Sequence, residues 1–238
     1  MINNLAEVEK RRGGVKEKLM LPITRGTFLR YAGASAAVTG LIVTGCDDVK
    51  ETNGRTEVDL GNGDTGILNY AYLLEQLEAA FYVKVMSSPY SGMTAAETTI
   101  LTEIRDHELA HRDFFKAALA ANAIPSVEFD LSSVNFNDRA SVLGTAKAFE
   151  DLGVSAYNGA GQLITNPEYL LIAGKIVSVE ARHASTIRDL ISPFTAAYAG
   201  DDVVTVDKGL DVSRTPTEVL TIASKYVVTP VKFDKLPS

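Results

Sequence analysis

Apolar residues recur at three- and four-residue spacing through five stretches of the chain, and this period is typical of helices. The predicted helices cover residues 64–86, 94–122, 138–159, 166–192 and 217–226. Start signals precede several of them, such as the capping sequence Thr94-x-x-Glu97 and the pair Asn166-Pro167. The pattern therefore predicts an all-α fold.

The lengths of the links between these helices indicate how they are connected. The first and third links are short, which favours antiparallel neighbours, whereas residues 123–137 form a long link between the second and third helices. Fully extended, that link spans roughly 50 Å, and the second helix is only about 40 Å long. It can therefore cross the whole domain. We expect a four-helix bundle with one long crossover, from the second to the third helix, plus a short C-terminal helix.

Two of the predicted helices carry the same four-residue motif on their apolar faces. Glu108-x-x-His111 lies in the apolar stripe of the second helix, and Glu180-x-x-His183 lies in that of the fourth. Side chains three residues apart are neighbours on a helix, so each motif presents a carboxylate and an imidazole together. Because a buried carboxylate is costly unless it is paired or binds a cation, the motifs predict a metal site.

The first and third helices supply matching side chains. When the two helices are aligned, Glu75 matches Glu150 and Tyr82 matches Tyr157. The step from this Glu to the Glu of the next motif is 33 residues in one half (75 to 108) and 30 in the other (150 to 180). The chain therefore reads as two related helix pairs, each supplying a Glu and then Glu-x-x-His.

Over residues 64–192 this arrangement resembles the superfamily of ferritin, bacterioferritin and rubrerythrin, and most closely its bacterial branch that includes desiccation-related proteins. The resemblance implies a ferritin-like bundle with two Fe or Mn ions, each held by one His and sharing carboxylates. The ligands that it implies are Glu75, Glu108, His111, Glu150, Glu180 and His183. Tyr82 and Tyr157 are expected beside them, either to hydrogen-bond the carboxylates or to donate an electron. Ordinary core packing is the alternative for both tyrosines.

Two neighbouring carboxylates compete with this assignment. Glu78 lies one turn beyond Glu75 on the same helix face, and Asp151 directly follows Glu150. The match between Glu75 and Glu150 favours these two residues. A bundle that has kept its shape but lost its metal is also left open.

Residues 107–111 also spell the H-E-x-x-H motif of zinc peptidases. In that interpretation His107 and His111 bind zinc and Glu108 is the base. It leaves the second Glu-x-x-His and both partner glutamates unexplained. In the favoured interpretation His107 is a residue behind the ligands or on the surface.

Composition narrows the classes of function. The chain has 238 residues, 46% of them hydrophobic, and a single Cys, which excludes a disulfide framework and a Cys-based zinc or iron–sulfur site. The net charge of −7 becomes −11 without residues 1–45, because that segment carries seven Lys/Arg and three Glu. A domain this acidic repels nucleic acid and attracts cations.

Residues 1–45 resemble an export signal rather than part of the fold. A basic region precedes the apolar run 31–43, and the following Thr44-Gly45-Cys46 completes a sequence similar to the lipobox of bacterial lipoproteins, in which the Cys receives lipid. Residues 24–30 are similar to a twin-arginine signal, but Gly26 stands where the second Arg is usual. Sec and Tat export therefore both stay open.

The remaining segments flank the predicted bundle. Residues 46–63 are polar, with several Gly and Asn, and are expected to form a flexible tether. Residues 193–238 are expected to form a C-terminal extension that contains the short helix.

Together these features predict a lipid-anchored protein of the bacterial cell envelope that faces the periplasm or the exterior. The resemblance implies redox chemistry on peroxide, oxygen or Fe(II), of peroxidase, catalase or ferroxidase type. A non-enzymatic metal-binding or stress-protection bundle is the alternative. The expected partners are metal ions, the membrane through a lipid on Cys46, and an external electron donor if the protein is a redox enzyme. A homodimer is left open, and nucleic acid is excluded.

Overall fold

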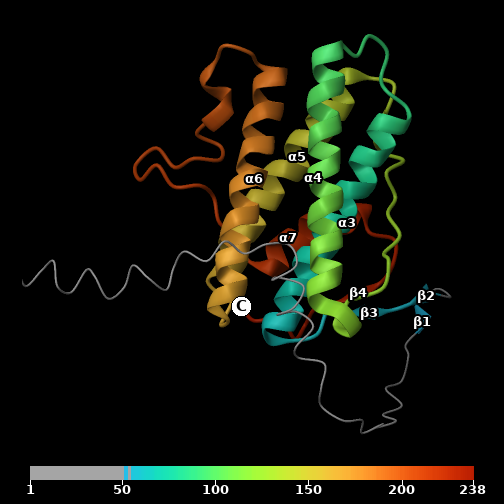
Figure 1. Ribbon diagram of the computed structural model, residues 1–238, viewed down its shortest axis with the longest axis vertical. Coiled ribbons are helices and arrows are strands. Elements are labelled where there is room, and N and C mark those ends of the chain that lie inside the picture. Colours follow the sequence, from blue (N-terminus) through green and yellow to red (C-terminus); the bar gives the residue numbers. More distant parts are fainter. Residues whose placement is uncertain (1–50, 53–54) are drawn as a thin grey trace, which may run out of the picture. The chain divides into compact units, whose positions relative to one another are not determined.

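The computed structural model describes residues 51–52 and 55–238, so the predicted signal segment and Cys46 lie outside the described residues. Four long helices stand side by side and form the body of the domain (Figure 1). They are α3 (Gly63–Ser87), α4 (Ala95–Leu119), α5 (Arg139–Gly161) and α6 (Pro167–Ile191). The predicted all-α bundle is confirmed, and the observed helix ends lie within about three residues of the predicted ones.

Side chains at the helix starts explain why the helices begin where they do. Thr94 and Glu97 form a reciprocal capping box at the start of α4. Asn166 accepts a hydrogen bond from the Glu168 N–H at the start of α6, and Pro167 occupies the first helical position. These caps satisfy backbone donors that the first turn of a helix leaves without partners.

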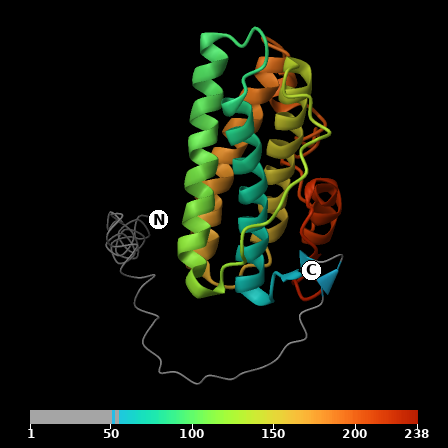
Figure 2. The same cartoon turned by 90° about the vertical axis from the view of Figure 1, so that its right-hand side faces the viewer.

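The helices pack as two pairs, α3 with α4 and α5 with α6. The link from α4 to α5 begins with the short 3-10 helix η1 (Ala120–Asn122) and then runs along the bundle (Figure 2). Buried polar side chains of α3 hold this crossover. Asn69 accepts from the N–H of Ile124 at 3.0 Å, and Gln76 accepts from the N–H of Val127 at 3.0 Å.

Residues that precede and follow the four helices in the sequence also contribute to the core. The prediction of a flexible tether over residues 46–63 is therefore wrong for its last residues, from Val58 onward. β3 (Val58–Asp59) pairs in parallel with β4 (Val231–Lys232), near the C-terminal end of the chain. Val58 and Leu60 are buried in the hydrophobic core. The segment from Val58 onward therefore belongs to the folded domain. β1 (Glu51–Thr52) and β2 (Arg55–Thr56) form a separate antiparallel pair.

The C-terminal extension contains two 3-10 helices and one α-helix: η2 (Ala196–Ala199), α7 (Pro216–Ala223) and η3 (Ser224–Tyr226). It crosses α5 at Gly159, where a Cβ would lie only 1.7 Å from the carbonyl oxygen of Arg214. The Arg214 N–H donates to the carbonyl of Ser155 at 3.0 Å. The missing side chain of Gly159 is therefore what allows the backbone to pack directly on the helix. Among the described residues, no helix has the length and apolar character needed to span a membrane.

Candidate metal centre

The structure brings the six predicted ligands together in the middle of the bundle. They come from all four long helices: Glu75 from α3, Glu108 and His111 from α4, Glu150 from α5, and Glu180 and His183 from α6. The four carboxylates are at most 1% exposed, and His183 is 4% exposed. Such burial of four acids is costly unless an opposite charge compensates for them.

The ligand atoms form two groups, and within each group they lie within 4.8 Å of one another. One group is Glu75, Glu108, His111 and Glu180, and the other is Glu108, Glu150, Glu180 and His183. Glu108 and Glu180 belong to both. Each group therefore has one imidazole and one carboxylate of its own, and the two groups share a pair of carboxylates.

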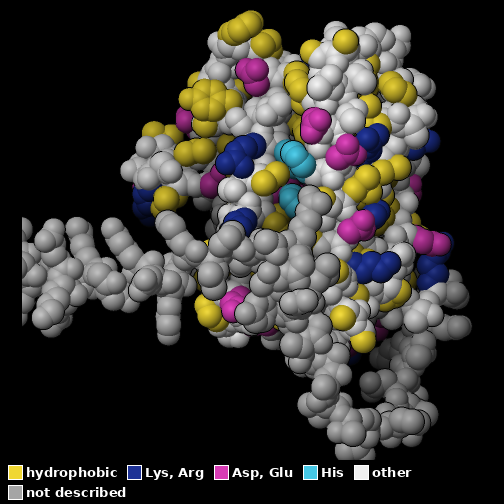
Figure 3. Space-filling model, viewed as in Figure 1, with side chains coloured by type: hydrophobic (Ala, Val, Ile, Leu, Met, Phe, Trp, Pro, Cys, Tyr) yellow, Lys and Arg dark blue, Asp and Glu magenta, His cyan; other side chains and the backbone are white. Residues whose placement is uncertain are grey.

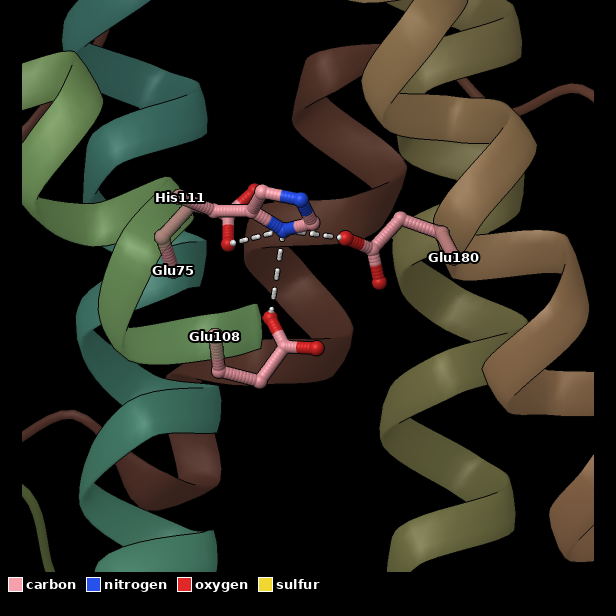
Figure 4. A group of neighbouring side chains, drawn as sticks. All are labelled: Glu75, Glu108, His111 and Glu180. Atoms are coloured by element: carbon pink, nitrogen blue, oxygen red, sulfur yellow. Dashed lines mark ion pairs between the residues drawn. The ribbon is translucent and has the colours of Figure 1, made fainter. Parts of the chain in front are cut away.

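Each imidazole points one nitrogen at three carboxylates, as Figure 4 shows for His111. Its Nδ1 lies 2.8 Å from Glu180, 3.5 Å from Glu75 and 3.6 Å from Glu108. Nδ1 of His183 has three carboxylate neighbours at the same distances, 2.8, 3.5 and 3.6 Å. The two halves of the site thus match in the distances between each imidazole and its three carboxylates.

The atoms that face one another do not satisfy one another. In the described part of the chain, eleven buried side-chain nitrogen or oxygen atoms have no hydrogen-bond partner, and eight of them belong to the six predicted ligands. The eight are both Nδ1 atoms and six carboxylate oxygens, which approach closely but without hydrogen-bond geometry. A buried polar atom without a partner costs about 1–3 kcal/mol. Lone pairs that converge in this way fit metal ions, so the residues present suit a pair of cations.

Two tyrosines hold the outer carboxylates. The hydroxyl of Tyr82 on α3 donates to Oε1 of Glu150, and that of Tyr157 on α5 donates to Oε1 of Glu75. Each tyrosine therefore reaches the carboxylate of the other helix pair and leaves Oε2 facing the centre. Burial raises the pKa of both hydroxyls well above the usual value, which keeps them protonated donors.

The protonation of the carboxyl and imidazole groups reduces the net negative charge of the site. Burial, reinforced by the Glu180 carboxylate, raises the pKa of Glu108 to about 8, and burial raises that of Glu150 to about 7. Burial opposes ionisation of Glu180 too, but the two imidazoles outweigh it and lower its pKa to about 2. Burial likewise opposes charging of His111 and His183, yet the carboxylates raise both pKa values to about 12. Protons and imidazolium groups thus occupy the electrostatic role that cations would take.

The comparison with known families agrees with this geometry. A family model described as a ferritin-like domain matches residues 63–193, more than half of the chain. The chain belongs to the ferritin-like domain family. No curated protein matches it. The family assignment confirms the resemblance inferred from the paired Glu-x-x-His motifs.

A further buried carboxyl group of the ferritin-like domain, on Glu78 of α3, lies near the four candidate ligand carboxylates. Glu78 is 4% exposed but belongs to neither group of ligand atoms, whereas Glu75 belongs to one. It lies against Gly153 of α5, where a Cβ would lie 3.0 Å from Glu78 Oε1. When α3 and α5 are aligned at Glu75 and Glu150, Glu78 matches Gly153. The missing side chain of Gly153 leaves the space that the Glu78 carboxyl group occupies. Burial and four neighbouring carboxylates raise the pKa of Glu78 far above the usual range, which keeps it neutral.

The competing acid on α5 has a different partner. Asp151 accepts two hydrogen bonds from the guanidinium of Arg188, at 2.8 and 2.7 Å. It belongs to neither group of ligand atoms, whereas its neighbour Glu150 does. The geometry therefore favours Glu150 over Asp151 as a ligand.

The third histidine of the ferritin-like domain lies behind the site. His107 is exposed, and its Nδ1 lies 2.9 Å from Nε2 of His183. Histidine side chains are visible at the surface between α4 and α6 in Figure 3. Because His107 belongs to neither ligand group, the zinc-peptidase interpretation receives no support. The sequence predicts His107 either behind the ligands or on the surface, and residue spacing along one helix does not identify its partner on another.

Proposed function

We propose that this ferritin-like domain binds two divalent ions, Fe or Mn, and uses them in redox chemistry on peroxide, oxygen or Fe(II). The observation that carries the proposal is the convergence of eight buried atoms without hydrogen-bond partners on two neighbouring points. Four carboxylates neutralise the four positive charges of two divalent ions. Oxygen-rich sites with one imidazole per metal favour Fe or Mn over metals that prefer sulfur.

The residues of such a site would have different roles. Glu108 and Glu180 would help to hold both ions, because they belong to both ligand groups. The hydroxyls of Tyr82 and Tyr157 orient the outer carboxylates. A pair of such metals, when bound, would supply two electrons to dioxygen or peroxide. A peroxidase-type cycle would then need an external electron donor, because one Cys cannot form a Cys-based redox centre.

Metal quantification on the purified protein tests the binding. We expect two Fe or Mn per chain in the wild type, and about one in Glu75→Ala, which removes a ligand from only one group. Glu108→Ala and Glu180→Ala should bind neither ion, because each removes a ligand from both groups. Glu103→Ala is the matched control, since Glu103 is an exposed acid on the same helix as Glu108. Wild-type occupancy in both shared-ligand variants contradicts the proposal.

Reaction with oxygen or peroxide separates the redox function from its alternative. Anaerobic protein loaded with Fe(II) or Mn(II) should consume peroxide or oxygen in proportion to bound metal, with a change in the optical spectrum. Metal that binds at two per chain without any such consumption supports the non-enzymatic metal-binding or stress-protection bundle instead.

We further propose that the protein is exported and anchored in the cell envelope by a lipid on Cys46. The support is sequence alone: the apolar run 31–43 and the lipobox-like residues that end at Cys46. Labelling with a fatty-acid analogue should mark the wild type but not Cys46→Ala, which should appear in the soluble fraction. Equal labelling of both proteins contradicts the anchor.

A further inference from the structure

We propose that His107 is a positioning residue that fixes the tautomer of His183 and thereby makes the two metal sites unequal. The inference rests on the metal site proposed above and concerns a residue outside both ligand groups. It starts from one contact, the 2.9 Å approach between Nδ1 of His107 and Nε2 of His183. The two ring planes lie 11° from parallel and their centroids are 5.2 Å apart, so an N–H in the plane of one ring can point at the nitrogen of the other.

The contact leaves one consistent arrangement of protons for a metal-bound His183. Its Nδ1 lies 2.8 Å from Glu108 among the ligand carboxylates, so this nitrogen has to present a lone pair to a metal. A neutral imidazole carries one proton, which must then be on Nε2. That N–H donates to Nδ1 of His107, which accepts only if its own proton is on its Nε2. An outer partner of this kind fixes both the tautomer and the ring orientation of a metal ligand.

The other half of the site has no such partner. The residue before Glu108 is His107, and the residue at the same position before Glu180 is Val179, whose side chain has no acceptor. No hydrogen bond to the outer nitrogen of His111 is present within the described part of the chain. The His111 side chain is also more exposed than that of His183, 13% against 5%. Two otherwise matching ligand groups therefore differ in how firmly their imidazole is held.

The functional consequence is an ordered pair of sites. The group that contains His183 should bind its ion more tightly and fill first, and the group that contains His111 should fill second. Loss of a partner behind a metal-binding His typically weakens metal binding by about 10–100-fold. We expect a difference of that size between the two binding steps.

Anaerobic titration with Co(II), monitored by calorimetry and by visible absorption, tests the inference. The wild type should show two steps. His107→Val introduces the residue found at the matching position 179. It should weaken the tighter binding step by about 10–100-fold and leave the weaker binding step unchanged. Val179→His is the reciprocal variant and should tighten the weaker step. His107→Gln, which keeps an acceptor, should recover part of the loss, and circular dichroism checks that each variant is folded.

The outcomes distinguish this inference from the function on which it rests. Wild-type protein that binds no cobalt overturns both. Wild-type protein that binds two ions, together with His107→Val that binds them with unchanged affinities, overturns only the role of His107. An equal loss at both steps also overturns it, because a general structural role would weaken both groups alike.

Discussion

Removal of either buried tyrosine hydroxyl should weaken metal binding without unfolding the bundle. Tyr82→Phe and Tyr157→Phe each delete the one hydroxyl donor to an outer carboxylate within the described residues, on Glu150 and on Glu75. Both carboxylates are at most 1% exposed, so water cannot readily replace the donor. The remaining oxygen of each has no hydrogen-bond partner in the described part of the chain. The substitution thus leaves a whole buried carboxylate without a donor.

The expected magnitude follows from that geometry. A hydrogen bond to a charged group contributes about 1.5–3 kcal/mol, and every 1.4 kcal/mol is about a tenfold change in affinity. Each variant should therefore lose about 10–100-fold in affinity for the ion in the group that contains its carboxylate. Competition with a chromophoric chelator, using Mn(II) or Co(II), measures the loss.

Tyr70→Phe is the matched control. Tyr70 lies on the same helix as Tyr82 and is 1% exposed, but its hydroxyl has no hydrogen-bond partner in the described part of the chain. Its loss should leave metal affinity unchanged and should not lower the free energy of unfolding. If Tyr82→Phe binds metal as tightly as Tyr70→Phe, the argument that the hydroxyl orients the ligand is wrong.

Three further predictions concern packing, pH and metal removal. Gly159→Ala should lower the free energy of unfolding by about 1–3 kcal/mol, because its Cβ would clash with the backbone of Arg214. In chemical denaturation Gly144→Ala, on the same helix with open space around its Cβ, should instead raise it by about 0.5–1 kcal/mol. Burial raises the pKa of Glu108 to about 8 and that of Glu150 to about 7, and the carboxylates raise those of His111 and His183 to about 12, so a cation must displace protons from all four groups. Metal affinity should therefore rise as pH increases from about 6 to about 8, with protons released to an indicator dye; a pH-independent affinity contradicts this. Chelation should lower the melting temperature, because free metal at 100 times its Kd stabilises the folded state by about 2.7 kcal/mol. An unchanged melting temperature would argue against bound metal.

The helices and the convergence of the six candidate ligands were predictable because local spacing marks the helices and their inner faces. A period of 3.6 residues and capping residues define the long helices, and the repeated Glu-x-x-His motif marks the inner faces of two of them. The match between Glu75 and Glu150 then selected one acid from each of the other helices over Glu78 and Asp151. All six selected residues converge in the structure.

Contacts between segments far apart in the chain were not predictable in this way. The strands Val58–Asp59 and Val231–Lys232 are two residues long, too short for any alternation of apolar and polar residues to mark them. The crossed pairing of each tyrosine with the carboxylate of the other helix pair depends on how the pairs dock. The same holds for the contact between His107 and His183, which lie on different helices.

The sharing of ligands between the two helix pairs has a mechanical consequence. The group that contains His111 takes Glu180 from the opposite pair, and the group that contains His183 takes Glu108 from it. Neither pair could bind either ion with a full ligand set by itself. A bound ion would therefore cross-link the two helix pairs. Metal loss should weaken the packing between the two helix pairs before it unfolds any single helix. Amide hydrogen exchange should therefore become faster first at the residues where the two pairs are in contact.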